Sequence, residues 1–234
     1  MMVGETLMGG IIAAGAGSRL RRDGWTMPKP LVPVAGVPLM ESVLSNFEAA
    51  GIASVVIIVN EHERDCAERM RARFPGRALD FIVETTASSL ESFLRVTAAP
   101  GRGRMLVSTV DAWCRPADFS RFVETAARRP AEAIVLAVTP LVADEKPLWV
   151  DLEPDGRVIA LGGRRGRFVT AGFYLIPERV RRLVPPPGHG RLRDYLAWLC
   201  EREQAVYGEI IPTVVDVDRG EDVALAEALA ARER

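Results

Sequence analysis

Apolar residues gather along the chain in short unbroken runs that alternate with longer stretches of helical spacing. The runs at residues 8–14 (MGGIIAA) and 54–60 (SVVIIVN) are almost wholly apolar, which is typical of strands buried on both faces of a parallel sheet. Between them, residues 37–50 carry one apolar stripe at helical spacing, and Gly51 follows as a helix stop. This part of the chain therefore predicts a strand, a helix and a second strand.

The same alternation continues as far as residue 139. Amphipathic stretches predict helices at residues 63–74, 88–98 and 119–129, and apolar runs predict strands at residues 79–83, 105–110 and 133–138. Repeated strand–helix units favour a mostly parallel sheet with right-handed crossovers and helices on both faces. The predicted fold class is therefore α/β and Rossmann-like.

The pattern changes after Pro140. Two short apolar stretches flank Asp155-Gly156, which predicts a hairpin with a tight turn, and residues 168–176 form a further predicted strand. Helices are predicted at residues 192–203 and 224–232. We expect a small, more antiparallel insertion on the main sheet, within a single domain that covers residues 1–234.

Composition narrows the class of protein without identifying it. The hydrophobic fraction of 48% is enough to build a buried core, and 30 basic against 31 acidic residues give a formal net charge of −1. This balance offers no electrostatic argument for binding a nucleic acid or a membrane. The chain shows no N-terminal leader pattern and no apolar run of about 18 residues, so we expect a cytoplasmic protein.

Cysteine and histidine are sparse and widely spaced. Three cysteines without a C-x-x-C pair make a disulfide framework and a structural zinc site poor hypotheses. The two histidines, His62 and His189, also lack metal-ligand spacing. Chemistry is therefore expected from other residue types.

The loop that follows the first predicted strand has the composition of a phosphate-binding loop. Residues 15–19 (GAGSR) place glycine N–H groups and one arginine at the carboxyl end of a strand, where open α/β sheets bind ligands. Farther on, prolines on both sides of Lys29 stiffen the backbone, so we expect its ammonium to be held out on a preset loop. Arg19 and Lys29 together could neutralise a triphosphate and the departing pyrophosphate.

Two better-known glycine-rich motifs are excluded by spacing. A Walker A loop needs a lysine directly after its glycines, and none is present here. In a dinucleotide-binding fingerprint a glycine would replace Leu20, and the second strand would end in an acidic residue rather than Asn60. A glycine-rich turn that only leads into a helix is the alternative interpretation.

Three adjoining segments resemble a known family. Residues 9–20 (GGIIAAGAGSRL), 28–34 (PKPLVPV) and 36–39 (GVPL) resemble the start of sugar-1-phosphate nucleotidylyltransferases and their molybdopterin-nucleotide-transferring relatives, which together form an NTP transferase superfamily. The chain departs from the pattern at Arg21-Arg22, where many members have a proline. The resemblance implies an enzyme in which Arg19 and Lys29 are catalytic. It also implies a nucleotide-binding set of Ala13, Ala14, Gly15, Gly17, Ser18, Arg19 and Lys29.

Nucleotidyl transfer builds negative charge on phosphate oxygens, which Mg²⁺ held by hard oxygen ligands can offset. Asp111 ends the predicted strand at residues 105–110, at the place where the family binds its metal. Asp216 lies in a late segment that resembles the family's second metal-binding strand. A helix-cap or turn role is the alternative for Asp111, and Asp218 is a competing cap for the last helix. We expect Asp111 and Asp216 to meet in space as Mg²⁺ ligands.

The remaining candidate residues concern the nucleotide and the acceptor. Ser88 and Ser89 lie between a strand and a helix, where they could cap that helix or contact the nucleotide. Thr170 and Gly172 belong to a segment that resembles the family's acceptor-pocket strand, and Lys146 precedes it. One of Arg164, Arg165 and Arg167 could also meet the acceptor phosphate, and the sequence does not select one.

The resemblance implies that the chain moves an NMP group from an NTP to a sugar 1-phosphate with release of pyrophosphate. On this interpretation, residues 1–139 bind the nucleotide, residues 140–215 bind the acceptor, and residues 216–234 close the site. The partners are an NTP and a phosphorylated small molecule. One alternative is a cytidylyltransferase for phosphocholine or inositol phosphate, and another is a non-catalytic nucleotide-binding module. A phosphocholine pocket would need an aromatic cage, for which the candidates are Trp149, Phe168, Phe173, Tyr174 and Trp198.

Overall fold

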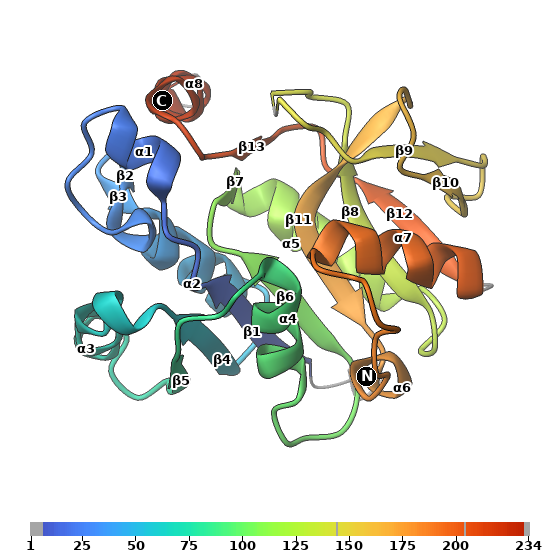
Figure 1. The fold of residues 1–234 in the computed structure, drawn as a ribbon, viewed down its shortest axis with the longest axis horizontal. Helices are drawn as coiled ribbons and strands as arrows, with labels where there is room; N and C mark the ends of the chain where they lie inside the picture. The colour runs from blue at the N-terminus through green and yellow to red at the C-terminus, as the bar shows by residue number, and fades with distance from the viewer. Residues whose placement is uncertain (1–6, 144, 204, 232–234) are drawn as a thin grey trace.

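A computed structural model of the chain describes residues 7–143, 145–203 and 205–231. A nine-stranded sheet runs through the molecule, with helices packed on each of its faces (Figure 1). Two two-stranded sheets lie outside it. No helix in these ranges is both long enough and apolar enough to span a bilayer.

The first half of the chain builds the parallel part of the sheet. Strand β1 lies between β4 and β6, both parallel to it, and β5 extends the sheet beyond β4. The bounds are Met8–Ala13 for β1, Ser54–Val59 for β4, Ala78–Val83 for β5 and Met105–Thr109 for β6. The apolar runs of β1, β4 and β6 are buried, as expected for strands covered on both faces, whereas β5 at the edge is only partly buried. The carboxyl ends of β1 and β6 consequently open at the same edge of the sheet.

The second half is largely antiparallel, as predicted. Strand β11 pairs antiparallel with β6, β8 and β9, and β9 continues into the hairpin with β10. Strand β12 is an exception, because it runs parallel to β8 and was not predicted from the sequence. The bounds are Ile134–Thr139 (β8), Trp149–Leu152 (β9), Val158–Leu161 (β10), Phe168–Ile176 (β11) and Val206–Ile210 (β12).

Two hydrophobic clusters cover the two faces of the sheet. One cluster gathers the apolar sides of α2 and α5 around Phe47, Phe119 and Phe173. The other gathers α4 and α7 around Phe93 and Tyr195. The helices are α2 (Leu39–Ala49), α3 (Asp65–Arg73), α4 (Ser89–Thr97), α5 (Pro116–Ala127), α6 (Glu178–Arg181) and α7 (Leu192–Arg202). The predicted fold class, with helices on both faces, is confirmed.

The remaining elements close over the carboxyl edge of β1 and β6. Helix α1 (Ser18–Arg22) and the strands β2 (Pro33–Val34) and β3 (Val37–Pro38) follow the glycine-rich loop. Strand β13 (Val214–Asp216) pairs antiparallel with β7 (Ala112–Cys114), and the last helix, α8 (Gly220–Ala231), follows it. Hydrogen bonds from Gly220 N to Asp23 Oδ2 (2.9 Å) and from Ala35 N to Glu227 Oε1 (3.2 Å) fix α8 against the first segments. Helix α8 thus packs against the segments that follow β1.

Candidate active site

The glycine-rich loop turns sharply where β1 ends and α1 begins. Ala13 and Ala14 are still buried, whereas Gly15 and Ser18 are exposed. Gly17 has a φ of 59°, and a Cβ atom on it would lie 3.0 Å from Lys29 Cβ. A glycine is therefore required here both by the backbone conformation and by the close approach of Lys29. Nothing lies within 4 Å of a Cβ built on Gly15, so a ligand can approach the backbone at that point.

The Lys29 side chain points inward, and the expectation that its ammonium is held out on a loop is wrong. The residue begins a short 3₁₀ helix after Pro28 and is only 7% exposed. Its Nζ donates to Asp111 Oδ2 at 2.5 Å and also to Asp218 Oδ1. The two carboxylates compensate for the burial of the ammonium, which explains why the lysine turns away from solvent.

Three aspartates converge on this lysine. Asp111 follows β6, Asp216 ends β13, and one carboxylate oxygen from each of Asp111, Asp216 and Asp218 lies within 4.8 Å of the others. The meeting of Asp111 and Asp216 that the sequence led us to expect is therefore observed. The main chain holds it, because Asp216 lies opposite Ala112 in the β7–β13 pair and Val217 N donates to Asp111 O at 3.0 Å.

Asp218 also belongs to the cluster, although the sequence did not predict it as a site residue. It was expected as a possible helix cap, but its carboxylate accepts from both Lys29 and Arg19. Asp222 takes the capping contacts instead, because its Oδ2 accepts from Asp218 N at 2.9 Å and from Arg219 N at 2.7 Å. The two-residue period of extended chain was an available signal, since it puts Asp216 and Asp218 on one side and buries Val217 on the other.

The charges of the cluster shift each other's ionisation. Burial alone lowers the pKa of the Lys29 ammonium, but Asp111, Asp218 and Asp216 more than offset this, and the net shift is upward. Burial raises the pKa of the Asp111 carboxyl, yet the Lys29 charge and hydrogen bond hold it below its usual value. Both groups are therefore charged at neutral pH, so the Lys29 ammonium and the Asp111 carboxylate form an ion pair within the cluster.

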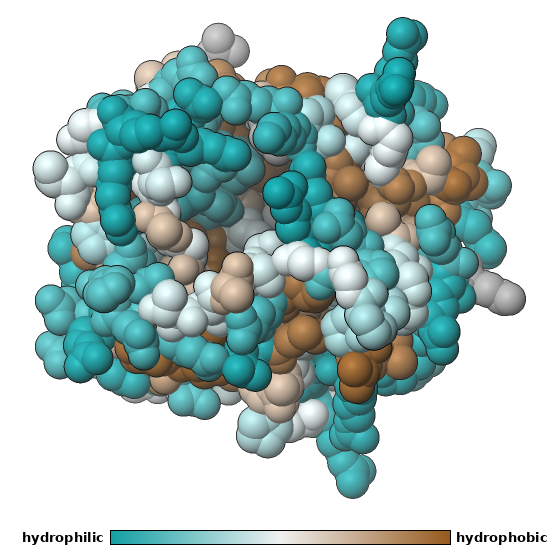
Figure 2. Space-filling model, in the orientation of Figure 1, coloured by the Kyte–Doolittle hydropathy of each residue, from teal (hydrophilic) through white to brown (hydrophobic). Residues whose placement is uncertain are grey.

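A pocket of about 240 Å³ adjoins the aspartates. Asp111, Asp216, Thr170 and Gly172 all line it, so two of the three predicted acceptor residues lie beside the two predicted metal ligands. Gly172 has a φ of 75°, and a Cβ atom there would lie 2.6 Å from Thr109 Oγ1. The glycine therefore lets β11 bend past the end of β6. In Figure 2 this face of the molecule is hollowed near its centre, between the surfaces over α1 and α7.

The other predicted contacts have different surroundings. Ser88 Oγ accepts from Glu91 N and caps α4, which was one of its two expected roles. Ser89 lines the pocket of Thr170, and its Oγ accepts from Leu192 N at 3.2 Å. Lys146 is exposed, and its backbone oxygen accepts from Arg193 Nη2 at 2.5 Å.

The three arginines at positions 164, 165 and 167 lie outside the pocket lining. All three are exposed, and Arg167 stacks over the ring of Phe168 at 5.7 Å. The arginine that does line the pocket is Arg193, in the first turn of α7. This arginine was not predicted from the sequence, because an arginine on an amphipathic helix is usually exposed to solvent.

The pocket has little aromatic lining. Of the five candidates for an aromatic cage, only Tyr174 lines it. Phe173 packs against Phe119 on the opposite face of the sheet, with 5.2 Å between ring centroids. Trp198 stacks on Tyr195 at 5.6 Å. An aromatic cage for a quaternary ammonium is therefore absent from the residues that line this pocket.

Solved structures of nucleotidyltransferases share the fold over nearly the whole chain. The inositol-1-phosphate CTP transferase from T. maritima superposes with a TM-score of 0.81 and 19% identity over 97% of this chain and 96% of that one. A putative glucose-1-phosphate thymidylyltransferase from Bacillus anthracis superposes with a TM-score of 0.82 and 18% identity over 96% of this chain and 95% of that one. These similarities confirm the architecture described above.

Proteins with similar sequences are named as transferases and synthases. A CMP-5'-(3-aminopropyl)phosphonate synthase of Streptomyces rubellomurinus is 28% identical over 74% of this chain and 28% of its own length. A glucose-1-phosphate thymidylyltransferase of Actinoplanes is 28% identical over 76% of this chain and 62% of its own. A bifunctional IPC transferase and DIPP synthase of Rubrobacter xylanophilus is 28% identical over 94% of this chain and 51% of its own. The chain thus covers less than two thirds of each of these three relatives.

One family model matches well over half of the chain. The profile of the MobA-like NTP transferase domain matches residues 9–160, which include the glycine-rich loop, Lys29 and Asp111. This match confirms the resemblance seen in the sequence. The chain belongs to the family of MobA-like NTP transferase domains.

Proposed function

We propose that this chain is a nucleotidyltransferase that transfers an NMP group from an NTP to a sugar 1-phosphate or a related polyol phosphate. The observation that carries the proposal is the convergence of Asp111 and Asp216 with Lys29 beside a small pocket. Acidic and basic side chains that meet at the carboxyl edge of the sheet suit a reaction in which the negative charge of phosphate groups must be bound and redistributed.

The triphosphate would bind along the glycine-rich loop. Gly15 leaves its backbone open to an approaching ligand, and Arg19 and Lys29 supply two cations at that end of the site. Because both cations contact Asp218 in this structure, the triphosphate would compete with that carboxylate for them. Ser18 is exposed at the start of α1, where its hydroxyl could reach a phosphate oxygen.

A divalent metal suits the acidic end of the site. The three aspartates offer hard oxygen ligands, and magnesium is commonly held by one or two carboxylates together with water and substrate phosphates. Asp111 and Asp216 would hold Mg²⁺, which when bound would offset negative charge on the reacting phosphate. The Lys29 ammonium would then turn from Asp111 towards the departing pyrophosphate.

In the proposed reaction, an oxygen of the acceptor phosphate attacks the α-phosphorus in line. The new P–O bond forms as the bond to the β-phosphate breaks, and pyrophosphate leaves with that electron pair. The attacking phosphate is already anionic, so no protein nucleophile is required. Positioning and charge stabilisation would supply most of the acceleration.

The lining of the pocket favours a hydroxylated acceptor over phosphocholine. Four residues with hydroxyl groups, Ser89, Thr139, Thr170 and Tyr174, line a space of about 240 Å³, which suits a compact sugar or cyclitol. The absence of an aromatic cage among the lining residues counts against a choline acceptor. Similarity to the T. maritima inositol-1-phosphate CTP transferase supports inositol 1-phosphate as a second acceptor to test.

The test is a pyrophosphate-release screen with Mg²⁺ over ATP, CTP, GTP, UTP and dTTP. The acceptors are glucose 1-phosphate, inositol 1-phosphate, phosphocholine and 3-aminopropylphosphonate, and reactions without acceptor serve as controls. We expect acceptor-dependent release with a sugar or inositol phosphate, together with an NDP-linked product in the mass spectrum. Tight NTP binding with no release for any acceptor would instead support a non-catalytic nucleotide-binding module.

A further inference from the structure

The charges that line the pocket are distributed unevenly. Among the described lining residues, Asp111 and Asp216 are the acids and Arg193 is the one base. The aspartates come from the ends of β6 and β13, whereas Arg193 comes from the first turn of α7. An acceptor between these elements would meet the metal-binding carboxylates and a guanidinium in the same small space.

Arg193 is held in place without being neutralised. It is half-buried, and its Nη2 donates to the backbone oxygen of Lys146 at 2.5 Å. No carboxylate within the described parts of the chain forms an ion pair with it, although many other arginines here have one, such as Arg73 with Glu41 and Arg129 with Glu209. A guanidinium carries five N–H donors, so one backbone contact leaves most of its hydrogen-bonding capacity for a ligand.

Tyr174 lines the same pocket as these charged residues. Its side chain is 6% exposed and lines the cavity. Arg193 and Tyr174 thus line the same small space as Asp111 and Asp216.

We propose that Arg193 is the residue that binds the anionic phosphate of the acceptor. The inference rests on the proposed function. It gives the role of acceptor-phosphate binding to Arg193 and not to the arginines at 164, 165 and 167. Arginine suits the role because its planar fork matches phosphate oxygens in pairs.

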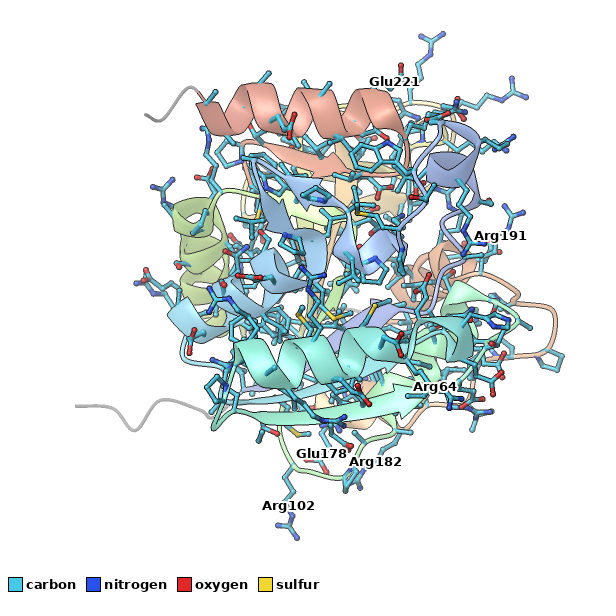
Figure 3. All side chains as sticks on the ribbon, turned by 90° about the vertical axis from the view of Figure 1, so that its left-hand side faces the viewer. Arg64, Arg102, Glu178, Arg182, Arg191 and Glu221 are labelled. Atoms are coloured by element: carbon cyan, nitrogen blue, oxygen red, sulfur yellow. The ribbon has the colours of Figure 1, made fainter. Side chains whose placement is uncertain are left out.

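The test compares acceptor binding in three variants of the full chain. Glucose 1-phosphate and inositol 1-phosphate are titrated calorimetrically with Mg²⁺ present, and inorganic phosphate serves as the minimal probe. Arg193→Gln keeps an N–H donor for the Lys146 carbonyl but loses the charge, and Arg193→Lys keeps the charge but loses the fork. Arg191→Gln is the matched control, because Arg191 is two residues earlier and reaches the surface in Figure 3.

We expect Arg193→Gln to weaken binding of the phosphorylated probes by about tenfold or more, the size of a lost charge-assisted hydrogen bond. Arg193→Lys should lose less affinity for these probes, and Arg191→Gln should lose none. The affinity for nucleotide should stay the same in all three variants. Unchanged acceptor binding in Arg193→Gln would overturn the assignment, as would an equal loss of nucleotide affinity. Failure of every phosphorylated probe to bind the wild type would overturn it too.

The same variants separate this inference from the proposed function. If the wild type releases pyrophosphate and Arg193→Gln shows an unchanged acceptor KM, the inference fails and the function stands. If the wild type releases no pyrophosphate with any acceptor, the function itself fails. A raised acceptor KM with an unchanged nucleotide KM supports both.

Discussion

At the scale of single residues, Lys29 connects the basic and acidic halves of the site. It is buried, it contacts Asp111 and Asp218, and its ammonium would have to serve phosphate oxygens during turnover. The sequence identified this lysine from its prolines and its distance from the glycine-rich loop. It could not show the inward direction of the side chain, because that depends on carboxylates more than 80 residues away in sequence.

Replacement of Lys29 by methionine tests that role with little change in volume. We expect Lys29→Met to lower kcat by at least about 100-fold, as expected when a preorganised charge at a reacting phosphate is lost. The far-ultraviolet circular dichroism should be unchanged. Arg22→Gln, an exposed neighbour of the loop, is the control and should keep full activity. Wild-type turnover in Lys29→Met would remove the lysine from the mechanism.

Glu63 makes a residue-scale prediction about pH. It is 3% exposed, neither carboxylate oxygen has a hydrogen-bond partner, and Arg21 Nη2 is 3.9 Å away. Burial raises the pKa of the Glu63 carboxyl, so the folded state holds its proton to a higher pH than the unfolded chain does. The protonated carboxyl therefore favours folding below the unfolded pKa of about 4.3, and this contribution is lost as pH rises through the folded pKa.

Glu63→Gln should remove that pH dependence. Urea unfolding at several pH values should show similar stability for the wild type and the variant near pH 4. At pH 7 the variant should be more stable by about 1 kcal/mol, because it no longer buries an unsatisfied charge. A constant difference between the two proteins across this range would contradict the assignment.

At the scale of elements, the bend of β11 positions the pocket. Gly172 adopts a φ of 75°, and the register of β11 against β8 shifts between Thr170 and Tyr174. A Cβ atom at Gly172 would lie 2.7 Å from Ala112 Cβ and would press on β7, next to Asp111. The strand itself was predictable from its apolar residues, and the glycine marked a close approach. The partner in that contact was not predictable from the sequence.

Gly172→Ala should therefore lower folding stability by more than the strain of its backbone conformation alone would. Gly51→Ala is the matched control, because Gly51 has a φ of 74° and nothing within 4 Å of its Cβ position. We expect about 1 kcal/mol of destabilisation for Gly51→Ala and roughly 1–3 kcal/mol more for Gly172→Ala, measured by urea unfolding. Equal losses would mean that the clash is relieved without cost. Only Gly172→Ala should also reduce transfer activity.

Elements with strong periodic patterns were predictable, and short or interrupted ones were not. The apolar runs of β1, β4 and β6 and the stripes of α2 and α4 match their predicted places closely. Strand β12 was missed because Gly208 interrupts it, and in the fold that glycine leaves room for Leu152, whose Cδ2 would lie 2.6 Å from an added Cβ. Helix α1 has five residues, too few for a helical stripe to appear in the sequence.

At the scale of the whole molecule, the sheet joins the two functional halves. Strand β11 from the late half pairs directly with β6 from the early half, and α8 packs back against the first segments. The division into a nucleotide part, an acceptor part and a closing part stays a prediction about function. We expect no independent folding, because separation at residue 139 would leave β6 and β8 without the β11 strand that pairs with both.

Tryptophan fluorescence can test this cooperativity. Trp25 packs against the cluster around Phe47, and Trp198 packs against the cluster around Tyr195, so they report opposite faces of the sheet. Urea titrations of Trp25→Phe and Trp198→Phe variants, each compared with the wild type, should give one coincident two-state transition after correction for each variant's stability. Two separate midpoints would show that the two faces of the sheet unfold independently.

The most direct measurement is the Mg²⁺-dependent rate of pyrophosphate release by the wild type, Asp111→Asn and Asp216→Asn, with the NTP and acceptor that the screen selects. The two aspartates lie more than 100 residues apart in sequence and meet only in the fold. We predict that each variant keeps its fold and loses activity by about 100-fold or more. Full activity in either variant, or equal wild-type rates with and without divalent metal, would contradict the proposed reaction.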